Sequence, residues 1–247
     1  MIELCKEEYP LLKELFPDDH PYVEVPMIVN GRRGRAWVDK KKNPCLGLIT
    51  TGCMIFIEGD GDPELLESVF TEFSSFYEEI NCDKRFGDRI FRSFEKVHET
   101  SNIIFEHDGR KRDFPIQPGI NVVEIDEAIF DRLDETGENW LSSMFDDGED
   151  FVRNSYGFAV LVDGVVASAA VAFGIDSHRA DIGVGTYGTY RNKGYSTLCA
   201  SACVNRTLER NLNPVWMTGP DNIASQCVAL KIGFTPIFEL PSYWIGD

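Results

Sequence analysis

The sequence lacks several features that would place a protein in a common class. No run of 18 or more apolar residues occurs, so no transmembrane helix is expected. The segment Met1–Glu8 has neither a basic region nor an apolar core, so no signal peptide is expected. The seven cysteines and four histidines show neither a C-x-x-C pair nor any other metal-ligand spacing. We therefore expect a cytoplasmic protein with free thiols, no metal site and no membrane partner.

Basic residues are scarce relative to acidic ones. The chain has 24 Lys and Arg against 41 Asp and Glu, a net charge of −17, which argues against a nucleic-acid partner. The imbalance is uneven: residues 121–150 hold eleven acids and one base, whereas residues 151–247 hold seven of each. A neutral last third suits a polyanionic ligand, and the acidic segment before it predicts a cationic partner. A solvated helix face is the more ordinary explanation of such a charge run.

One basic cluster resembles a phosphate-binding loop in its residues. It comprises Gly31–Ala36 and the lysines at 40–42. Because it leads into a predicted strand and not into a helix, we interpret it as a solvated loop.

The composition and the residue patterns predict a mixed α/β protein. With 43% hydrophobic and 12% aromatic residues, the chain can build a sizeable core. A linker over 108–119 contains Pro115 and Pro118, and we place a domain boundary there, giving domains 1–118 and 119–247. In the first domain we predict strands at 36–38, 47–50, 54–57 and 102–105, and helices over 62–80 and 86–93. In the second we predict helices over 126–135, 138–145, 195–203 and 222–231, and strands at 122–125, 158–162, 165–173, 181–186, 215–217 and 235–240. Asp163-Gly164 predicts a type I′ hairpin turn.

The segment from Arg191 to Ser196 has the composition of an anion-binding turn. It follows a predicted strand and precedes a helix, so its backbone N–H groups and the positive end of the helix dipole can face an anion. Gly194 lets the backbone approach a phosphate, and Lys193 can add charge. We therefore predict a phosphate site formed by Arg191, Asn192, Lys193, Gly194, Tyr195 and Ser196. The alternative is an ordinary strand–helix turn.

A second signal lies further along the chain. Asn222 can cap the predicted helix over 222–231, and Gly233 can adopt the left-handed conformation that ends it. Phe234 would then pack on the sheet. Alone, this pattern predicts only a well-capped helix.

Together the two signals resemble the acetyl-CoA-binding half of GNAT-type N-acetyltransferases, over about residues 120–247. The family pattern Arg/Gln-x-x-Gly-x-Gly/Ala corresponds to Arg191, Gly194 and Ser196, with serine in place of the usual glycine or alanine. The patterns Asn-x-x-Ala/Ser and Lys-x-Gly-Phe correspond to Asn222, Ser225, Lys231, Gly233 and Phe234. The resemblance is closest to a subgroup that includes zwittermicin-resistance acetyltransferases.

The resemblance implies an acyl-CoA N-acyltransferase fold with acetyl-CoA as acyl donor. Its pantetheine arm would enter between two diverging strands, with the thioester beside Val184 and Thr186. Asn222, Ser225 and Lys231 would complete the cofactor-binding set. The smaller N-terminal α/β domain is then interpreted as a degenerate relative of the same fold.

The resemblance also implies direct transfer, in which a neutral amine attacks the thioester and a base takes its proton. Asp181 stands where many members carry a strand glutamate and is the predicted base; Glu239 is a lesser candidate. The tyrosine that often protonates the leaving thiolate is replaced by Ala229. Tyr187, Tyr190, Tyr243 or solvent would have to serve instead.

The predicted function is transfer of an acetyl group to the primary amine of a cationic small molecule, by a protein that can form a homodimer. Two alternatives stay open. One is a protein or peptide N-acetyltransferase. The other is a non-catalytic protein that keeps the CoA-binding fold for sensing; the missing tyrosine favours it, whereas the phosphate loop favours an enzyme.

Overall fold

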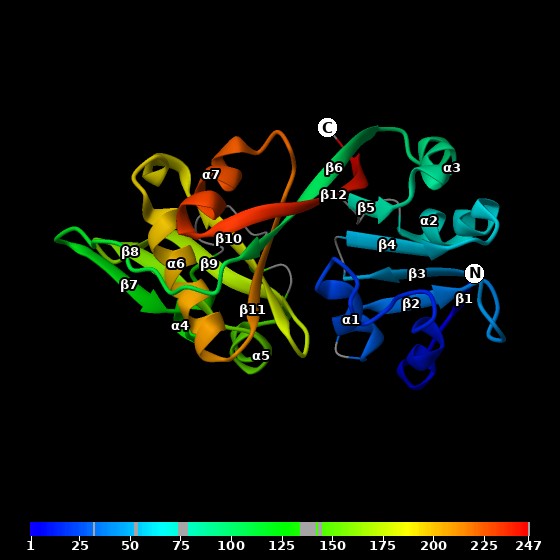
Figure 1. Cartoon of the computed structure of the whole chain (residues 1–247), viewed down its shortest axis with the longest axis horizontal. Coiled ribbons are helices and arrows are strands. Elements are labelled where there is room, and N and C mark those ends of the chain that lie inside the picture. The colour runs from blue at the N-terminus through cyan, green and yellow to red at the C-terminus, as the bar shows by residue number, and fades with distance from the viewer. Residues whose placement is uncertain (32, 52–53, 74–78, 134–141, 143–144, 247) are drawn as a thin grey trace. The chain divides into compact units, whose positions relative to one another are not determined.

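The computed structural model describes residues 1–31, 33–51, 54–73, 79–133, 142 and 145–246. These residues form two compact units: residues 1–103 together with 239–247, and residues 104–238 (Figure 1). Each unit combines helices with strands that pair in both parallel and antiparallel directions, so the predicted α/β class is confirmed. Among the described helices, none is long and apolar enough to cross a membrane.

The first unit is built on five strands in sequence order, followed by the end of the chain. Strand β1 pairs with β2, β2 with β3 and β3 with β4, all antiparallel, and β4 pairs with β5 in parallel. Residues 242–244 of β12 pair antiparallel with β5. The elements are β1 (Ile2–Glu3), η1 (Lys6–Leu12), α1 (Glu24–Val29), β2 (Arg35–Val38), β3 (Leu46–Thr50), β4 (Met54–Gly59), η2 (Pro63–Leu66), α2 (Glu67–Phe73), β5 (Glu79–Cys82), η3 (Lys84–Phe86), α3 (Gly87–Ser93) and β6 (Val97–His107).

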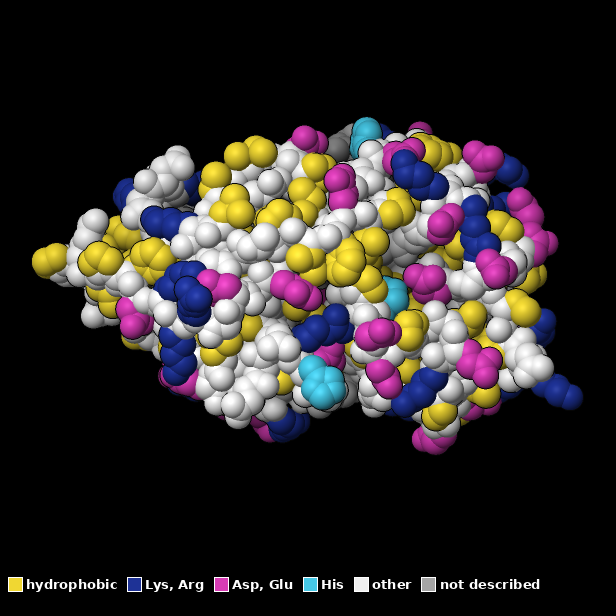
Figure 2. All heavy atoms as spheres, in the orientation of Figure 1, with side chains coloured by type: hydrophobic (Ala, Val, Ile, Leu, Met, Phe, Trp, Pro, Cys, Tyr) yellow, Lys and Arg dark blue, Asp and Glu magenta, His cyan; other side chains and the backbone are white. Residues whose placement is uncertain are grey.

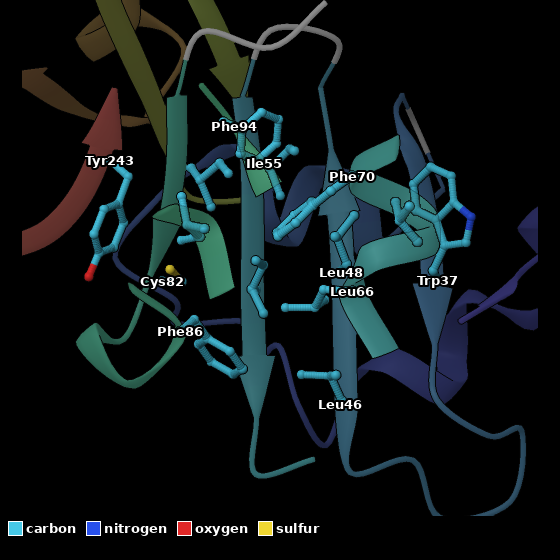
Figure 3. Close-up of a cluster of buried hydrophobic side chains, with 14 residues drawn as sticks. Trp37, Leu46, Leu48, Ile55, Leu66, Phe70, Cys82, Phe86, Phe94 and Tyr243 are labelled. Atoms are coloured by element: carbon cyan, nitrogen blue, oxygen red, sulfur yellow. The ribbon is translucent and has the colours of Figure 1, made fainter. Parts of the chain in front are cut away.

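The core of the first unit lies between its strands and the helices α2 and α3. Figure 3 shows side chains of the strands, such as Leu48 and Ile55, meeting Phe70 of α2. Tyr243, from the C-terminal strand, is buried in the same cluster. The last strand is therefore part of this core.

The second unit repeats this plan. Strand β7 pairs with β8, β8 with β9 and β9 with β10, all antiparallel, and β10 pairs with β11 in parallel. The elements are β7 (Ile120–Glu124), α4 (Glu127–Phe130), α5 (Gly148–Asn154), β8 (Gly157–Val162), β9 (Val165–Ile175), β10 (Arg179–Thr186), η6 (Gly188–Tyr190), α6 (Tyr195–Glu209), β11 (Asn213–Thr218), α7 (Ile223–Ile232) and β12 (Phe234–Ile245).

The two units thus share one order of elements and one pattern of strand pairing, although no sequence repeat is apparent. In both, four antiparallel strands lead through a helix to a strand that is parallel to the fourth. The exchange of terminal segments is reciprocal: residues 104–107 of β6 belong to the second unit, and residues 239–247 return to the first. The compact units divide near residue 103. The domain boundary that we predict at residue 118 refers to parts that fold independently, and it stays a prediction.

Helix α6 is held on the strands of the second unit by buried polar contacts. The hydroxyl groups of Tyr156 and Thr207 lie 2.7 Å apart, and both side chains are buried. Near its other end, Cys199 lies 3.4 Å from the hydroxyl of Ser168 on β9. Burial raises the pKa of the Cys199 thiol to about 12, so the thiol is protonated at neutral pH and acts as a packing group. These contacts hold both ends of α6 on the strands.

Most predicted strands are confirmed, and the turn at Asp163 and Gly164 has the two positive φ angles, 51° and 80°, of a type I′ turn. The helix predicted over 62–80 is wrong at its end, because Ile80 lies in β5. Pairing of this short strand with β4 and β12 outweighs the helical spacing of its apolar residues. Of the predicted acidic helices, the first is α4 and is shorter, and most of 138–145 lies outside the described residues. Helices α1 and α5 and strand β5 were not predicted.

Candidate functional site

The main feature of the second unit is the divergence of its two parallel strands. The pairing of β10 with β11 covers three residue pairs and ends at Asp181 and Val215. Both strands continue, β10 to Thr186 and β11 to Thr218. Backbone groups beyond the last pair are thereby available to an extended ligand, which can bind by adding a strand.

The corresponding strands of the first unit stay together. Strands β4 and β5 form four parallel pairs, which use the whole length of β5. The fully described strands of the first unit therefore leave no comparable opening.

The loop between β10 and α6 has the geometry of an anion-binding nest. Asn192 and Gly194 both have positive φ, 63° and 82°. Gly194 is the N-cap of the 15-residue helix α6, and no side chain caps that helix end. The first backbone N–H groups of α6 lack intrahelical partners, so they can donate to an anion. Arg191 is turned toward the strand, where its Nε donates to the carbonyl of Thr186 at 3.1 Å.

The loop after β4 in the first unit is different in charge. It carries Asp60 and Asp62, and the Asp62 side chain caps the following helix by accepting from the Glu64 N–H. A carboxylate thus takes the place at which a phosphate would bind, so this loop is unsuited to anions. The basic cluster from Gly31 also leads into a strand, as predicted, with Arg35 at the start of β2.

Helix α7 packs against β11 and α6. The Asn222 side chain caps it by accepting from the Ser225 N–H, as the sequence predicts, and Gly233 ends it with φ of 109°. The Ser225 hydroxyl accepts a hydrogen bond from Trp216 Nε1 on β11, at 3.0 Å. Asn222 and Ser225 therefore have structural partners, and their contact with a cofactor stays a prediction.

The exposed face of α7 is apolar apart from one cation. Ile223 and Leu230 are 61% and 54% exposed, and Figure 2 shows hydrophobic side chains gathered over this helix. Lys231 is the only charged residue between Ile223 and Ile232. The basic charge of α7 is thus confined to its C-terminal end.

A hollow of about 190 Å³ lies beside the loop that precedes α6. Its walls come from that loop, from the start of α6, from the end of α7 and from the segment before β7. They comprise Phe114, Pro115, Gln117, Ile120, Lys193, Gly194, Tyr195, Thr197, Leu198 and Lys231. Four of the residues that we predict to bind the cofactor thus line one hollow: Lys193, Gly194, Tyr195 and Lys231. The structure adds Phe114 and Gln117, which the sequence analysis missed because they lie in a predicted linker.

The predicted base, Asp181, lies where the two strands part. Its side chain is 7% exposed. On its other side β10 pairs with β9. There two residues of β9, Phe173 and Gly174, lie opposite Asp181 alone, so the ladder contains a β-bulge. Bulges are frequent beside active sites, where they redirect side chains.

Other residues on β10 have distinct surroundings. By strand alternation Asp181 shares a face with Gly183, which packs so closely on Phe173 that a Cβ there would lie 1.8 Å from the ring. Thr186 is on the opposite face, with its hydroxyl 2.8 Å from that of Ser168. Ser168 also contacts Cys199, so this is the face that α6 covers. Val184, two residues before Thr186, lies on the same face and is half-buried.

The tyrosines considered as proton donors lie in different places. Tyr187 is buried in the core under α4 and α5. Tyr190 is half-buried in the loop, with Lys193 Nζ 5.4 Å from its ring centroid. Tyr243 belongs to the first unit, where its hydroxyl donates to the carbonyl of Lys84 at 3.5 Å, and burial raises its pKa to about 12. Glu239 also belongs to the first unit and accepts a hydrogen bond from Ser101 at 2.7 Å.

Among the described residues, no group of three or more His, Cys, Asp or Glu side chains could hold a metal ion.

Comparison with known proteins gives one family. The family model described as GNAT acetyltransferase matches residues 13–243. No curated protein sequence matches the chain significantly. The subgroup that includes zwittermicin-resistance acetyltransferases is not distinguished by the family match and stays a prediction.

Solved structures match across both units. The chain is similar to a GCN5-related N-acetyltransferase-like protein from Streptococcus suis, with 21% identity and a TM-score of 0.82, covering 96% of this chain and 98% of that chain. It is also similar to a tandem GNAT protein from the clavulanic acid biosynthesis pathway, with 12% identity and a TM-score of 0.64, over 98% and 96% of the two chains. A third match is a GCN5-related N-acetyltransferase from Sphaerobacter thermophilus, with 9% identity and a TM-score of 0.63, over 98% and 94%. At these identities the likenesses show the fold.

Proposed function

Because this chain belongs to the GNAT acetyltransferase family, we propose that its second unit transfers the acetyl group of acetyl-CoA to a primary amine. The observation that carries the proposal is the parting of β10 and β11 next to a helix N-terminus without a side-chain cap. This combination offers main-chain hydrogen bonds to an extended arm and N–H donors to its phosphates. The first unit has neither feature in its corresponding strands and loop.

In this proposal the donor is held mostly by backbone groups. The N–H groups of residues 192–196 bind the pyrophosphate, and the side chain of Lys193 adds positive charge beside them, whereas Lys231 contributes to the same donor site from the far end of α7. The strand edge from Val184 to Thr186 pairs with the pantetheine arm and places the thioester carbonyl at the gap. Acetyl-CoA supplies the activated acyl group, and no metal has a part.

Asp181 takes the proton of the attacking amine in this proposal. A base in this place needs a carboxylate within hydrogen-bond reach of the amine at the strand gap, and Asp181 lies at the last paired position before the gap opens. Backbone N–H groups of β10 stabilise the oxygen on which negative charge develops. The leaving thiolate takes a proton from solvent or from Tyr190, since Ala229 offers none.

The decisive experiment measures thiol release from acetyl-CoA in the presence of amines. We expect release that depends on an added amine, from a panel of polyamines, aminoglycosides and basic peptides, together with a mass increase of the acceptor by one acetyl group. A neutral amine and a reaction without amine are the controls. Firm binding of acetyl-CoA without thiol release by any amine would instead favour a non-catalytic sensing protein. Acetylation of peptides alone would favour a peptide N-acetyltransferase.

We propose a cationic acceptor because acids are concentrated just before the transferase strands. Several described acids are already engaged: Glu124 makes a bidentate pair with Arg206 at 2.6 and 3.0 Å, and Asp126 and Asp147 cap α4 and α5. The electrostatic field of the segment is therefore weaker than its formal charge would produce.

The acceptor KM should accordingly rise by only about two- to threefold when the ionic strength increases from low to physiological values, because the Debye length shortens to about 8 Å. Initial rates for a cationic and a neutral amine at several salt concentrations measure this effect. A salt-independent KM for the cationic amine would contradict the proposal.

We further propose that the first unit is a degenerate copy of the same fold. Its strand order and pairing match those of the second unit, and a structurally similar protein carries the description tandem GNAT. We propose that it does not bind a second donor, since its β4 and β5 remain paired.

A further inference from the structure

The segment 108–119, here called the strap, connects β6 to β7 and runs along α6. Its main chain is fastened at Arg112, whose N–H donates to Asn205 Oδ1 at 3.1 Å and whose carbonyl accepts from Asn205 Nδ2 at 3.0 Å. Ser201, one turn earlier on α6, donates to the same carbonyl. Lys111 pairs with Glu209 at 2.8 Å. Side chains spaced by four residues along α6 therefore fix the path of the strap.

The strap is also fastened to the end of α7. The Asp108 N–H donates to the carbonyl of Gly233 at 3.1 Å, and a Cβ on Gly233 would lie 2.1 Å from the Arg112 guanidinium. Arg112 in turn pairs with Asp108 at 2.6 Å. An extended segment without secondary structure is thus held on two helices before it reaches the hollow.

Beyond these anchors the strap forms one wall of the hollow. Phe114 is half-buried there, and Lys231 Nζ lies 5.5 Å from its ring centroid. Lys193 and the N-terminus of α6 also line the hollow. None of the ten lining residues is acidic.

This combination has the chemistry of a nucleotide site. An aromatic face can stack on a planar base, and ammonium groups can bind phosphates that lie beyond the base. A site for an apolar ligand would need neither lysine.

We propose that the strap forms the nucleotide end of the donor site: Phe114 stacks on the adenine of CoA, and Lys231 binds its 3′-phosphate. The inference rests on the proposed acetyl-CoA site and deepens it, since the pyrophosphate loop Asn192–Ser196 borders the same hollow. The strap connecting the units in sequence therefore has a second role as a wall of the cofactor site.

Calorimetric binding of CoA, dephospho-CoA and adenosine 3′,5′-bisphosphate to the full-length protein tests the inference. Phe114→Ala should weaken all three by about 10-fold, within the range that loss of base–aromatic stacking produces. Phe114→Leu keeps an apolar side chain and should show a similar loss, which guards against misfolding of the alanine variant. Ile116→Ala is the matched control on the strap, because Ile116 is 53% exposed and does not line the hollow.

Lys231→Gln tests the phosphate contact separately. It should weaken CoA and the bisphosphate by about fivefold at low salt and leave dephospho-CoA unchanged, because only the first two carry the 3′-phosphate.

Unchanged CoA affinity in both Phe114 variants would overturn the strap inference while leaving the acetyl-CoA site intact. Equal losses in Ile116→Ala would overturn it as well. A wild-type protein that binds none of the three ligands would refute the proposed function itself.

Discussion

Asp181→Asn is expected to lower kcat by about 10²–10⁴-fold, the usual loss when a general base is removed, while the affinity for acetyl-CoA stays the same. The carboxylate is buried at the last paired residue of β10, next to the gap into which the amine must come. An amide of the same shape cannot accept the proton of the amine. Steady-state rates together with direct binding of acetyl-CoA separate the chemical step from donor binding.

Asp163→Asn supplies a matched control. Asp163 is exposed in the β8–β9 turn with φ of 51°, a conformation that asparagine adopts readily, so this variant should keep full activity. A folded Asp181→Asn protein with an unchanged kcat would remove Asp181 from the mechanism. Attack by an amine that is already neutral would then need no protein base.

Much of the second unit could be predicted from local sequence signals, because the residues that form its turns and helix caps are recognisable in the sequence. Asp163-Gly164 specifies a turn that only left-handed backbone can make, and both residues have positive φ. Asn222 and Gly233 mark the two ends of α7, and both act as caps. In these places side-chain chemistry determines backbone conformation over a few residues.

The first unit was harder to predict because its short elements depend on distant partners. Strand β5 has four residues and is held by β4 on one side and by the C-terminal residues of β12 on the other. No local pattern encodes a strand that pairs with residues 242–244, so Ile80 was wrongly assigned to a helix. The repeated topology was equally hidden, since it is a property of pairing and not of matching residues.

In the candidate site, too, local features could be predicted from the sequence and features that depend on distant partners could not. The turn from Asn192 to Ser196 could be identified as a candidate anion site from the sequence, because glycine and serine follow a strand within a few residues. The place of Phe114 in the hollow could not be predicted, because it depends on Ser201 and Asn205, which hold the strap from a helix much later in the chain. The parting of β10 from β11 was expected only through the family resemblance.

Gly194→Asp is expected to weaken acetyl-CoA binding by about 10- to 100-fold relative to Gly194→Asn. A like charge about 5 Å from a phosphate costs roughly 1.5–3 kcal/mol at an effective dielectric constant of 20–40. The comparison with asparagine isolates that charge, because the two side chains have nearly the same shape. Asparagine also tolerates the left-handed conformation at this position, where φ is 82°.

Space around Gly194 makes the pair of variants interpretable. A Cβ built there has no neighbouring atom within 4 Å, so neither side chain is forced against the protein. Calorimetry at low and high salt should show the difference between the two variants shrinking as salt rises, since the repulsion between exposed charges is screened. Equal affinities of folded Asp and Asn variants at low salt would mean that the donor phosphates bind elsewhere. In that case the uncapped N-terminus of α6 would be only a strand–helix turn.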